Sequence, residues 1–356
     1  MVLFRNEEFF VEETVIVEQK GCSGLIKLNR PKVLNSLNLD MIRTISHAFD
    51  RFLEDSLISR VILMGASGKA FCAGADVRKI SELVQNGDKE QAYAFFREEY
   101  QLNKKIKNYS KTVISIMDGI TMGGGVGLAH HGHYRVAGER YVFAMPEVTI
   151  GFFPDVGASS ILARLACHAG YYLGMTGANI SQQTAFKLGL VTHKISSQSF
   201  ASLIEALCHQ PSVEEVLASF SVSSDNGEKN NQLEDLIGHL DFVDKAFSVA
   251  NAWDVLTFVT KEAQLGNIFA QDTLSLMLQK SPLSMSVAFE LIKLAKSLSV
   301  DEVLMLDWQL AQKMILSHDF HEGVRAQLID KDKKPQWKPE HFDLSLQPLV
   351  ASLFKH

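Results

Sequence analysis

The first 200 residues of the chain alternate short runs rich in valine and isoleucine with longer stretches whose apolar residues recur at helical spacing. This alternation restricts the chain to the α/β class, because strands and helices that follow each other in turn pack as sheets covered by helices. Continuous apolar runs are typical of strands that are buried on both faces. We predict strands at residues 13–19, 24–31, 60–66, 112–119, 134–138 and 190–195, and helices at residues 39–55 and 89–109.

The strand patterns fade after about residue 200, where the polar stretch 221–232 is the best candidate for a loop. Helical patterns dominate the rest of the chain, at residues 243–263, 273–298 and 300–317. A chain of 356 residues with 46% hydrophobic content can bury a large core. We therefore expect an α/β core over residues 1–200 and a mainly helical region over residues 201–356.

Three consecutive glycines, Gly123 to Gly125, stand directly ahead of an apolar run that is compatible with a helix. Glycine destabilises a helix by roughly 1 kcal/mol relative to alanine, so such a run usually marks the close approach of another backbone or of a ligand. A dinucleotide fingerprint would need a further glycine at the position of Leu128, and a phosphate-binding loop would need a following GKS or GKT. The sequence has neither, so neither kind of nucleotide site is predicted.

A second loop of small residues, Ala73-Gly74-Ala75, follows the strand predicted at residues 60–66. Two strand-to-helix loops with bare backbone can aim two N–H groups at one point, which is the arrangement that stabilises an oxyanion. Glu147 and Asp155 each follow a proline in a loop-like context. A loop carboxylate alone is usually only solvated, but beside two candidate oxyanion loops both become candidates for acid–base chemistry.

These stretches together resemble the crotonase superfamily, the enoyl-CoA hydratase/isomerase group. The resemblance covers roughly residues 14–200 and rests on four ordered motifs: LNRPKVLNSLN, AFCAGADV, DGITMGGGVGLA and FAMPEVTIGFFPDVG. It implies a spiral of ββα units followed by C-terminal helices. Within the superfamily the chain is most similar to the 3-hydroxyisobutyryl-CoA hydrolases, and this likeness continues through FREEYQLN, KSPLSMSVAFELIK and DFHEGVRAQLIDKDKKPQWKP.

The resemblance implies a role for several residues of this sequence. It places the two oxyanion N–H donors at Ala75 and Gly124 and the retained acidic residue at Glu147. Hydratases of the superfamily carry a second catalytic glutamate at the position of Gly127 and a glycine at the position of Asp155. In this chain the second acidic residue stands at position 155 and not at position 127. This difference favours hydrolysis over hydration.

The hydrolase-like pattern also implicates Glu99 in the substrate pocket, although a glutamate on a helix, such as the adjacent Glu98, can equally be an ordinary surface residue. Lys32, Ala73 and Arg78 match positions that meet coenzyme A in relatives, and CoA enters only as part of the substrate, so no separate cofactor is expected. The chain departs from the hydrolase pattern at residues 158–161, which read Ala-Ser-Ser-Ile where glycines and an aromatic residue are usual. We expect this segment near the acyl pocket.

The implied reaction is hydrolysis of a short branched 3-hydroxyacyl-CoA thioester, such as the 3-hydroxyisobutyryl-CoA of valine degradation. Glu147 is expected to act as general base on a water or as a nucleophile that forms a mixed anhydride. Asp155 is expected to orient the 3-hydroxyl group or to protonate the departing thiolate. Two alternatives stay open: an enoyl-CoA hydratase, and a non-catalytic acyl-CoA-binding protein on the same scaffold.

Composition argues against other classes of function. The net charge of −6 gives no basic field for nucleic acid, and no apolar stretch approaches the ~20 residues of a membrane helix. The four cysteines form no CxxC pair, and the cluster of His130, His131 and His133 has no accompanying ligand set, so no metal site is expected. The acidic first 13 residues do not fit a leader, and a cytoplasmic protein is expected. Relatives commonly form trimers or dimers of trimers, so the resemblance implies a homo-oligomer.

Overall fold

The larger of two sheets contains six strands in the order β1-β2-β3-β5-β7-β10. β1 and β2 are antiparallel, and every other neighbouring pair in this sheet is parallel. All six strands predicted from the sequence are present, and β2, β3 and β5 are buried almost throughout, as their continuous apolar runs indicated. The strands are Val15–Lys20, Ser23–Leu28, Arg60–Gly65, Thr112–Met117, Tyr134–Ala137 and His193–Lys194.

The smaller sheet has four short strands in the order β4-β6-β8-β9. They are Ala70–Cys72, Ile120–Met122, Val142–Ala144 and Ile180–Ser181. Along the chain, β3, β5 and β7 belong to the large sheet, and the strand that follows each of them belongs to the small sheet. The chain thus passes three times from a strand of the large sheet to a strand of the small sheet. Because β4 and β6 are paired, the loops that follow them lie side by side.

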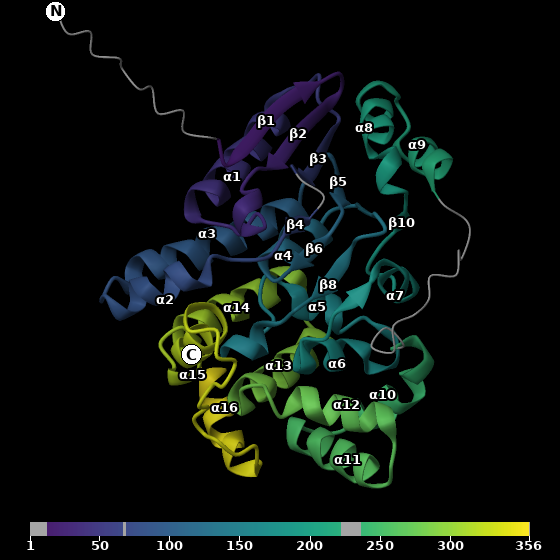
Figure 1. Ribbon diagram of the computed structural model, residues 1–356. Helices are drawn as coiled ribbons and strands as arrows, with labels where there is room; N and C mark the ends of the chain where they lie inside the picture. Colours follow the sequence, from purple (N-terminus) through teal and green to yellow (C-terminus); the bar gives the residue numbers. More distant parts are fainter. Residues whose placement is uncertain (1–12, 67–68, 222–235, 356) are drawn as a thin grey trace, which may run out of the picture.

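Helices connect these strand pairs and cover the sheets (Figure 1). Helix α3 packs against both α1 and α14, so an early and a late part of the chain meet on it. The helices of the first half are α1 Leu39–Glu54, α2 Val77–Gln85, α3 Lys89–Lys107, α4 Gly124–His130, α5 Ala158–Leu162, α6 Ala169–Thr176 and α7 Gln182–Lys187.

After β10 the described chain is helical. Helices α8 (Phe200–His209) and α9 (Val213–Phe220) pack apolar side chains against the large sheet, and the later helices pack on the opposite side of the molecule (Figure 1). These are α10 Leu240–Phe247, α11 Ala252–Gln264, α12 Ile268–Met277, α13 Pro282–Ala295, α14 Val300–Met314, α15 His318–Val324 and α16 Gln347–Leu353. A domain boundary near residue 200 stays a prediction.

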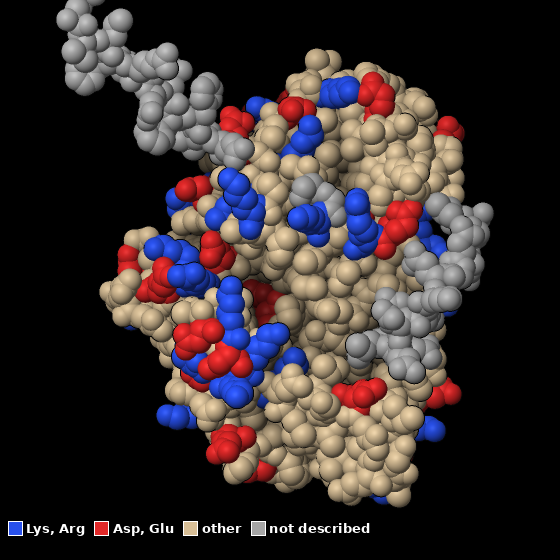
Figure 2. Space-filling model, in the orientation of Figure 1, with Lys and Arg blue, Asp and Glu red and all other residues tan. Residues whose placement is uncertain are grey.

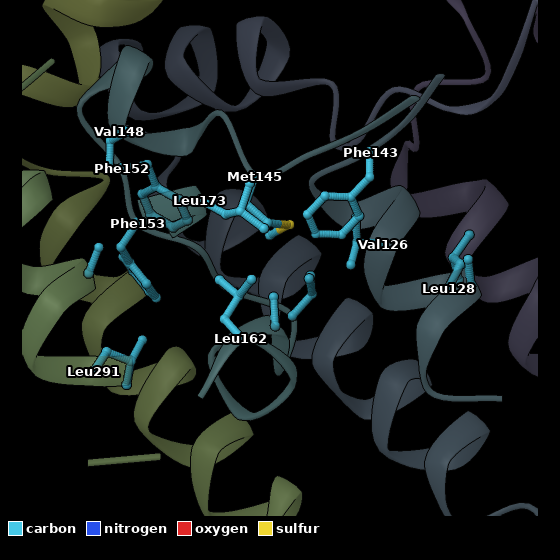
Figure 3. Packing of buried hydrophobic residues seen from close by; sticks show 14 of the residues in the cluster. Val126, Leu128, Phe143, Met145, Val148, Phe152, Phe153, Leu162, Leu173 and Leu291 are labelled. Atoms are coloured by element: carbon cyan, nitrogen blue, oxygen red, sulfur yellow. The ribbon is translucent and has the colours of Figure 1, made fainter. Parts of the chain in front are cut away.

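Buried apolar side chains join the small sheet to the C-terminal helices. Figure 3 shows Phe143 and Met145, at the end of β8, beside Val126 of α4, with Leu162 of α5 below them. Phe153 belongs to the same cluster and is fully buried. The segment that follows β8 is therefore anchored on both sides by tightly packed hydrophobic residues, and polar residues on it have fixed positions.

The computed structural model describes residues 13–66, 69–221 and 236–355. Almost all of the acidic N-terminal segment and of the loop predicted at 221–232 lies outside these residues. Within the described part of the chain, no helix combines the length and the apolar character needed to cross a lipid bilayer.

Candidate active site

A cavity of about 650 Å³ opens where the loops after β4 and β6 meet the segment after β8. The segment after β2, helix α3 and the residues Gln327, Leu328 and Lys331 contribute the rest of its wall. Three buried carboxyl groups, those of Glu99, Glu147 and Asp155, line it, together with the partly exposed Asp76, which pairs with Arg30. In agreement with this lining, Figure 2 shows a hollow with acidic side chains at its bottom and Lys and Arg side chains on the surface around it.

The loop after β4 leaves the N–H group of Ala75 without a hydrogen-bond acceptor in the described chain. The amides of its neighbours Ala73 and Asp76 donate to the carbonyl oxygens of Leu34 and Leu37, at 3.0 and 2.9 Å. Gly74 adopts a φ of +103°, which residues with a side chain rarely adopt. Ala75 lines the cavity, and its N–H donates to no partner within the described chain.

The loop after β6 brings the amide of Gly124 to the same place. Gly123 has φ +51° and ψ −127°, a conformation that favours glycine, and Gly124 begins helix α4. The first amides of a helix have no partner within it, and the Gly124 N–H donates to nothing else in the described structure. A methyl group on Gly124 would lie 3.5 Å from the Ala75 nitrogen and 2.3 Å from Glu99 Oε1. The two amides therefore lie close together, in a position that admits no side chain.

Glu147 begins a one-turn helix, Glu147–Ile150, directly after Pro146. Its side chain is 7% exposed, and its Oε1 would lie 2.8 Å from a methyl group on Gly123. The Oε2 atom is buried without a hydrogen-bond partner among the described residues. The glutamate is thus aimed at the glycine loop and is not held by another protein group.

Asp155 lies on the loop between this turn and helix α5. The hydroxyl group of Tyr100, on helix α3, donates a hydrogen bond of 2.7 Å to Asp155 Oδ2. This contact favours the ionised form of Asp155, because a donor stabilises negative charge.

Glu99 and Glu98 are neighbours on α3 with opposite environments. Glu99 follows the buried Phe95 and Phe96 at helical spacing, so it lies on the buried face of the helix, and it is 1% exposed. Both of its oxygens lack a partner within the described chain. Glu98 instead pairs with Arg43 at 2.7 Å on the outer face.

Burial raises the pKa of the three buried carboxyl groups, Glu99, Glu147 and Asp155. For Asp155 burial dominates and the Tyr100 hydroxyl opposes it, so the pKa is about 7. Burial first and the neighbouring Asp155 second raise the pKa values of Glu99 and Glu147 well above the ordinary value. Neighbouring carboxyl groups that disfavour each other's ionisation titrate one after another, so a base and a proton donor can coexist in the cavity.

Gly127 does not line this cavity and lies in the packing between α4, α3 and the loop of Asp155. A methyl group there would lie 2.7 Å from Val156 Cβ and 2.8 Å from Asn103 Oδ1. Asn103 is fully buried. The space beside Gly127 is thus filled by the loop of Asp155 and by α3, so a side chain at this position would require these neighbours to shift.

Two buried side chains hold the loop that carries Asp155. His131 Nε2 lies 2.7 Å from the carbonyl oxygen of Val156, and the amide of Gly157 donates to Asp307 Oδ2 at 2.7 Å. Val156 has a φ of +55°, which a β-branched residue rarely adopts. The strained residue is therefore fixed by contacts from α14 and from the end of α4. Neither Tyr100 nor Asp307 was singled out by the sequence.

Basic residues lie at the rim of the cavity. Lys32 and Arg78 line it as expected, but Arg78 is exposed and pairs with Glu82 at 3.2 Å. Lys331, from the segment after α15, also lines the cavity. Nothing in the sequence distinguishes Lys331 from the other lysines of the stretch 331–334.

Other expected features lie elsewhere. Residues 158–161 do not line the 650 Å³ cavity, although they were expected near the acyl pocket. Ser160 and Ile161 line a smaller cavity together with His130 and His131. The described residues contain no group of three or more His, Cys, Asp or Glu side chains arranged to hold a metal ion.

From β3 to β8, consecutive strands of this protein alternate between the large and the small sheet. Two free loop amides and buried carboxyl groups line the same cavity. These features together define a protein of the crotonase fold. The sequence model of one family in this class, described as enoyl-CoA hydratase/isomerase, matches residues 23–354. The chain belongs to this family.

Known relatives agree with this assignment over most of the chain. The chain is 40% identical over 333 residues to the human 3-hydroxyisobutyryl-CoA hydrolase, mitochondrial, covering 92% of this chain and 84% of the relative. Identity to the Xenopus laevis protein of the same name is also 40%, covering 95% and 88% of the two chains.

Solved structures confirm the fold. A carnitinyl-CoA dehydratase from Mycobacterium thermoresistibile superposes with a TM-score of 0.88 at 31% identity, covering 97% of each chain. An enoyl-CoA hydratase from Rhodobacter sphaeroides superposes with a TM-score of 0.84 at 30% identity, covering 96% of this chain and 97% of the other.

Proposed function

We propose that this protein hydrolyses a short branched 3-hydroxyacyl-CoA thioester, specifically 3-hydroxyisobutyryl-CoA, in valine degradation. The observation that carries the proposal is one cavity that combines the free amides of Ala75 and Gly124 with the buried carboxyl groups of Glu147 and Asp155. The 40% identity to 3-hydroxyisobutyryl-CoA hydrolases over nearly the whole chain supports it.

In this mechanism the thioester oxygen accepts hydrogen bonds from the Ala75 and Gly124 amides. These amides stabilise the negative charge that forms on the oxygen when the carbonyl carbon is attacked, and they need no rearrangement because their loops are already fixed. Removing one such donor typically costs on the order of 10²-fold in rate. The bare backbone at Gly123 and Gly124 lets the thioester approach both amides.

Glu147 supplies the base or the nucleophile. As a base, its carboxylate takes a proton from water while the water oxygen bonds to the carbonyl carbon. As a nucleophile, its oxygen bonds to that carbon, the C–S bond breaks, and water then hydrolyses the mixed anhydride. In either route the CoA thiolate takes up a proton, which a protonated neighbouring carboxyl group can provide. Asp155, anchored by Tyr100, is proposed to hold the 3-hydroxyl group or to provide this proton.

Hydration of an enoyl-CoA is the second candidate, because the two structures with the highest TM-scores given above carry dehydratase and hydratase names. The position of Gly127 argues against it, since the space that a second glutamate would need is filled by Asn103 and Val156. Release of free thiol from 3-hydroxyisobutyryl-CoA, measured beside hydration of crotonyl-CoA, separates the two. Hydration faster than thiol release would overturn the hydrolase assignment, and binding without either reaction would favour a non-catalytic acyl-CoA-binding protein.

The proposed hydrolysis uses water and the carboxyl groups of the chain, and CoA takes part only as substrate. We therefore propose that activity persists after dialysis against EDTA, and complete loss that Mg²⁺ or Zn²⁺ restores would contradict this. A cytoplasmic location also stays a proposal, and the relatives are named as mitochondrial. Imaging of the full chain with a C-terminal tag distinguishes the two compartments.

A further inference from the structure

Residues from two sequence features that do not line the acyl-CoA cavity meet at a second cavity of about 230 Å³. These are His130 and His131 of the histidine cluster and Ser160 and Ile161 of the segment 158–161. The second cavity lies behind the loop of Asp155, because His131 lines it and also binds the carbonyl oxygen of Val156. Asp155 lines the first cavity, whereas Ser160 lines the second.

Three basic side chains line this second cavity: Lys107, Arg135 and Arg164. They come from the end of α3, from β7 and from the turn after α5. None of the three forms an ion pair with an acidic residue of the described chain, and no acidic residue lines the cavity. This grouping is notable in a chain whose net charge is −6.

Arg135 is fixed in place by the backbone. Its Nε donates to the carbonyl oxygen of Leu190 at 2.8 Å, and its Nη1 donates to that of Gly132 at 3.3 Å. A guanidinium group has five N–H donors, so these two bonds leave donors for another partner. Burial lowers the pKa of Arg135, because its surroundings disfavour positive charge. A partly buried cation of this kind is normally balanced by an anion.

The three positive charges all act on His131. Burial lowers the pKa of His131 to about 4 against the hydrogen bond to Val156, which raises it, and Lys107, Arg135 and Arg164 contribute smaller decreases to this value. Burial and then Arg135 lower the pKa of His130 to about 3. Both imidazoles are therefore neutral at pH 7, so the neutral His131 donates to Val156 and the cavity keeps only the positive charges of its basic side chains.

We propose that this second cavity is a binding site for a small oxyanion of the phosphate or carboxylate class. Arginine and lysine donors grouped around a hollow match the oxygen acceptors of such an anion. The volume is below the ~300 Å³ at which pockets for drug-sized ligands begin, so a small anion fits and a nucleotide does not. The site is separate from the proposed hydrolysis and does not depend on it.

The test measures binding of inorganic phosphate by the full chain at pH 7 and low ionic strength, using calorimetry with CoA present to occupy the rim of the first cavity. The key variant is Lys107→Gln/Arg164→Gln, because both side chains are exposed and the fold should tolerate the change. Its matched control is Lys245→Gln/Lys261→Gln, which removes the same charge from exposed positions of α10 and α11.

We expect the wild type and the control to bind phosphate with the same affinity, and the key variant to bind at least about tenfold more weakly. Acetate titrated in place of phosphate shows which class binds more tightly. In the wild type, anion binding should also shift the imidazole NMR signals of His130 and His131. The proposal is overturned if the wild type binds neither anion at tens of millimolar, or if the key variant and the control bind equally well.

Discussion

Glu147 and Asp155 share one cavity but differ in their contacts. Asp155 accepts a hydrogen bond from Tyr100, whereas Glu147 has one buried oxygen with no partner within the described chain and the other directed at the glycine loop. A carboxyl group that is free of protein partners and faces bare backbone can approach a substrate carbon. A carboxyl group that is held by a tyrosine is better suited to orient a hydroxyl group or to exchange a proton.

The first prediction concerns Glu147→Gln, which keeps the shape of the side chain but can neither accept a proton nor form an anhydride. We expect kcat for thiol release to fall by roughly 10²- to 10⁴-fold while CoA and substrate still bind. Glu98→Gln is the matched control, since Glu98 lies on the outer face of α3, and it should keep normal turnover. A folded Glu147→Gln enzyme with near-normal kcat would contradict the mechanism.

The second prediction concerns Asp155→Asn and stability. The folded state raises the pKa of Asp155 from 3.8 to about 7, so between these values the folded chain holds a proton that the unfolded chain has released. The contribution of Asp155 to the free energy of unfolding therefore falls as pH rises through this window. Asparagine cannot ionise and can still accept the Tyr100 hydrogen bond.

Relative to the wild type, Asp155→Asn should gain stability between pH 5 and pH 8, by on the order of 1–3 kcal/mol in urea unfolding. Asp241→Asn, at an exposed position of α10, should have the same small effect at both pH values. A pH-independent effect of Asp155→Asn would show that burial does not perturb this carboxyl group in the folded chain.

The sequence could indicate only some of the residues in the cavity. Glu147 and Asp155 stand in recognisable motifs, and the structure brings both into one cavity with the expected loop amides. Tyr100 was not predicted, because in the sequence it is one more apolar position on an amphipathic helix. Asp307 could not be predicted either, since it reaches its partner Gly157 only through the packing of α14.

At the scale of elements, the third prediction concerns the contact between α14 and the loop of Asp155. Asp307 is fully buried, and burial raises its pKa well above the ordinary value, which favours the neutral form of the carboxyl group. Asn resembles this neutral form and can still accept the Gly157 N–H. Ala leaves that N–H without a partner and lets Val156 leave its strained conformation.

We therefore expect Asp307→Asn to keep near-normal kcat, and Asp307→Ala to lower kcat by about 10- to 100-fold through displacement of Asp155. The loss should appear in kcat more than in KM, because the rim of the cavity is unchanged. Circular dichroism establishes that both variants fold. Equal kcat values for the two folded variants would show that Asp307 does not position the loop.

The elements themselves were predictable to different degrees. The six strands of the large sheet were predicted because continuous valine and isoleucine runs leave a clear pattern. The four strands of the small sheet have only two or three residues each, too few for any periodicity to show. The helical pattern at 243–263 is in fact two helices, α10 and α11, separated at Ser248–Asn251, where Asn251 caps the second helix.

At the scale of the whole molecule, the charge distribution differs from what the composition indicates. The net charge of −6 predicts no attraction for a phosphate-bearing substrate. The fold nevertheless gathers Lys32, Arg78 and Lys331 at the mouth of the acyl cavity, from segments about 300 residues apart in the chain. Net charge averages over the surface, and a local field depends on which residues the fold places together.

The fourth prediction follows from this local field and concerns Lys331→Gln. Losing one exposed positive charge should raise KM for an acyl-CoA by about 2- to 5-fold at low ionic strength and leave kcat unchanged. The increase should shrink at 0.5 M salt, because exposed charges are then screened. The corresponding acyl-pantetheine thioester lacks the nucleotide phosphates, so its KM should not change.

Lys333→Gln, in the same segment but outside the cavity lining, is the control and should leave both KM values unchanged. If Lys331→Gln raised KM equally for both thioesters, Lys331 would act on the acyl end of the substrate and not on the phosphates.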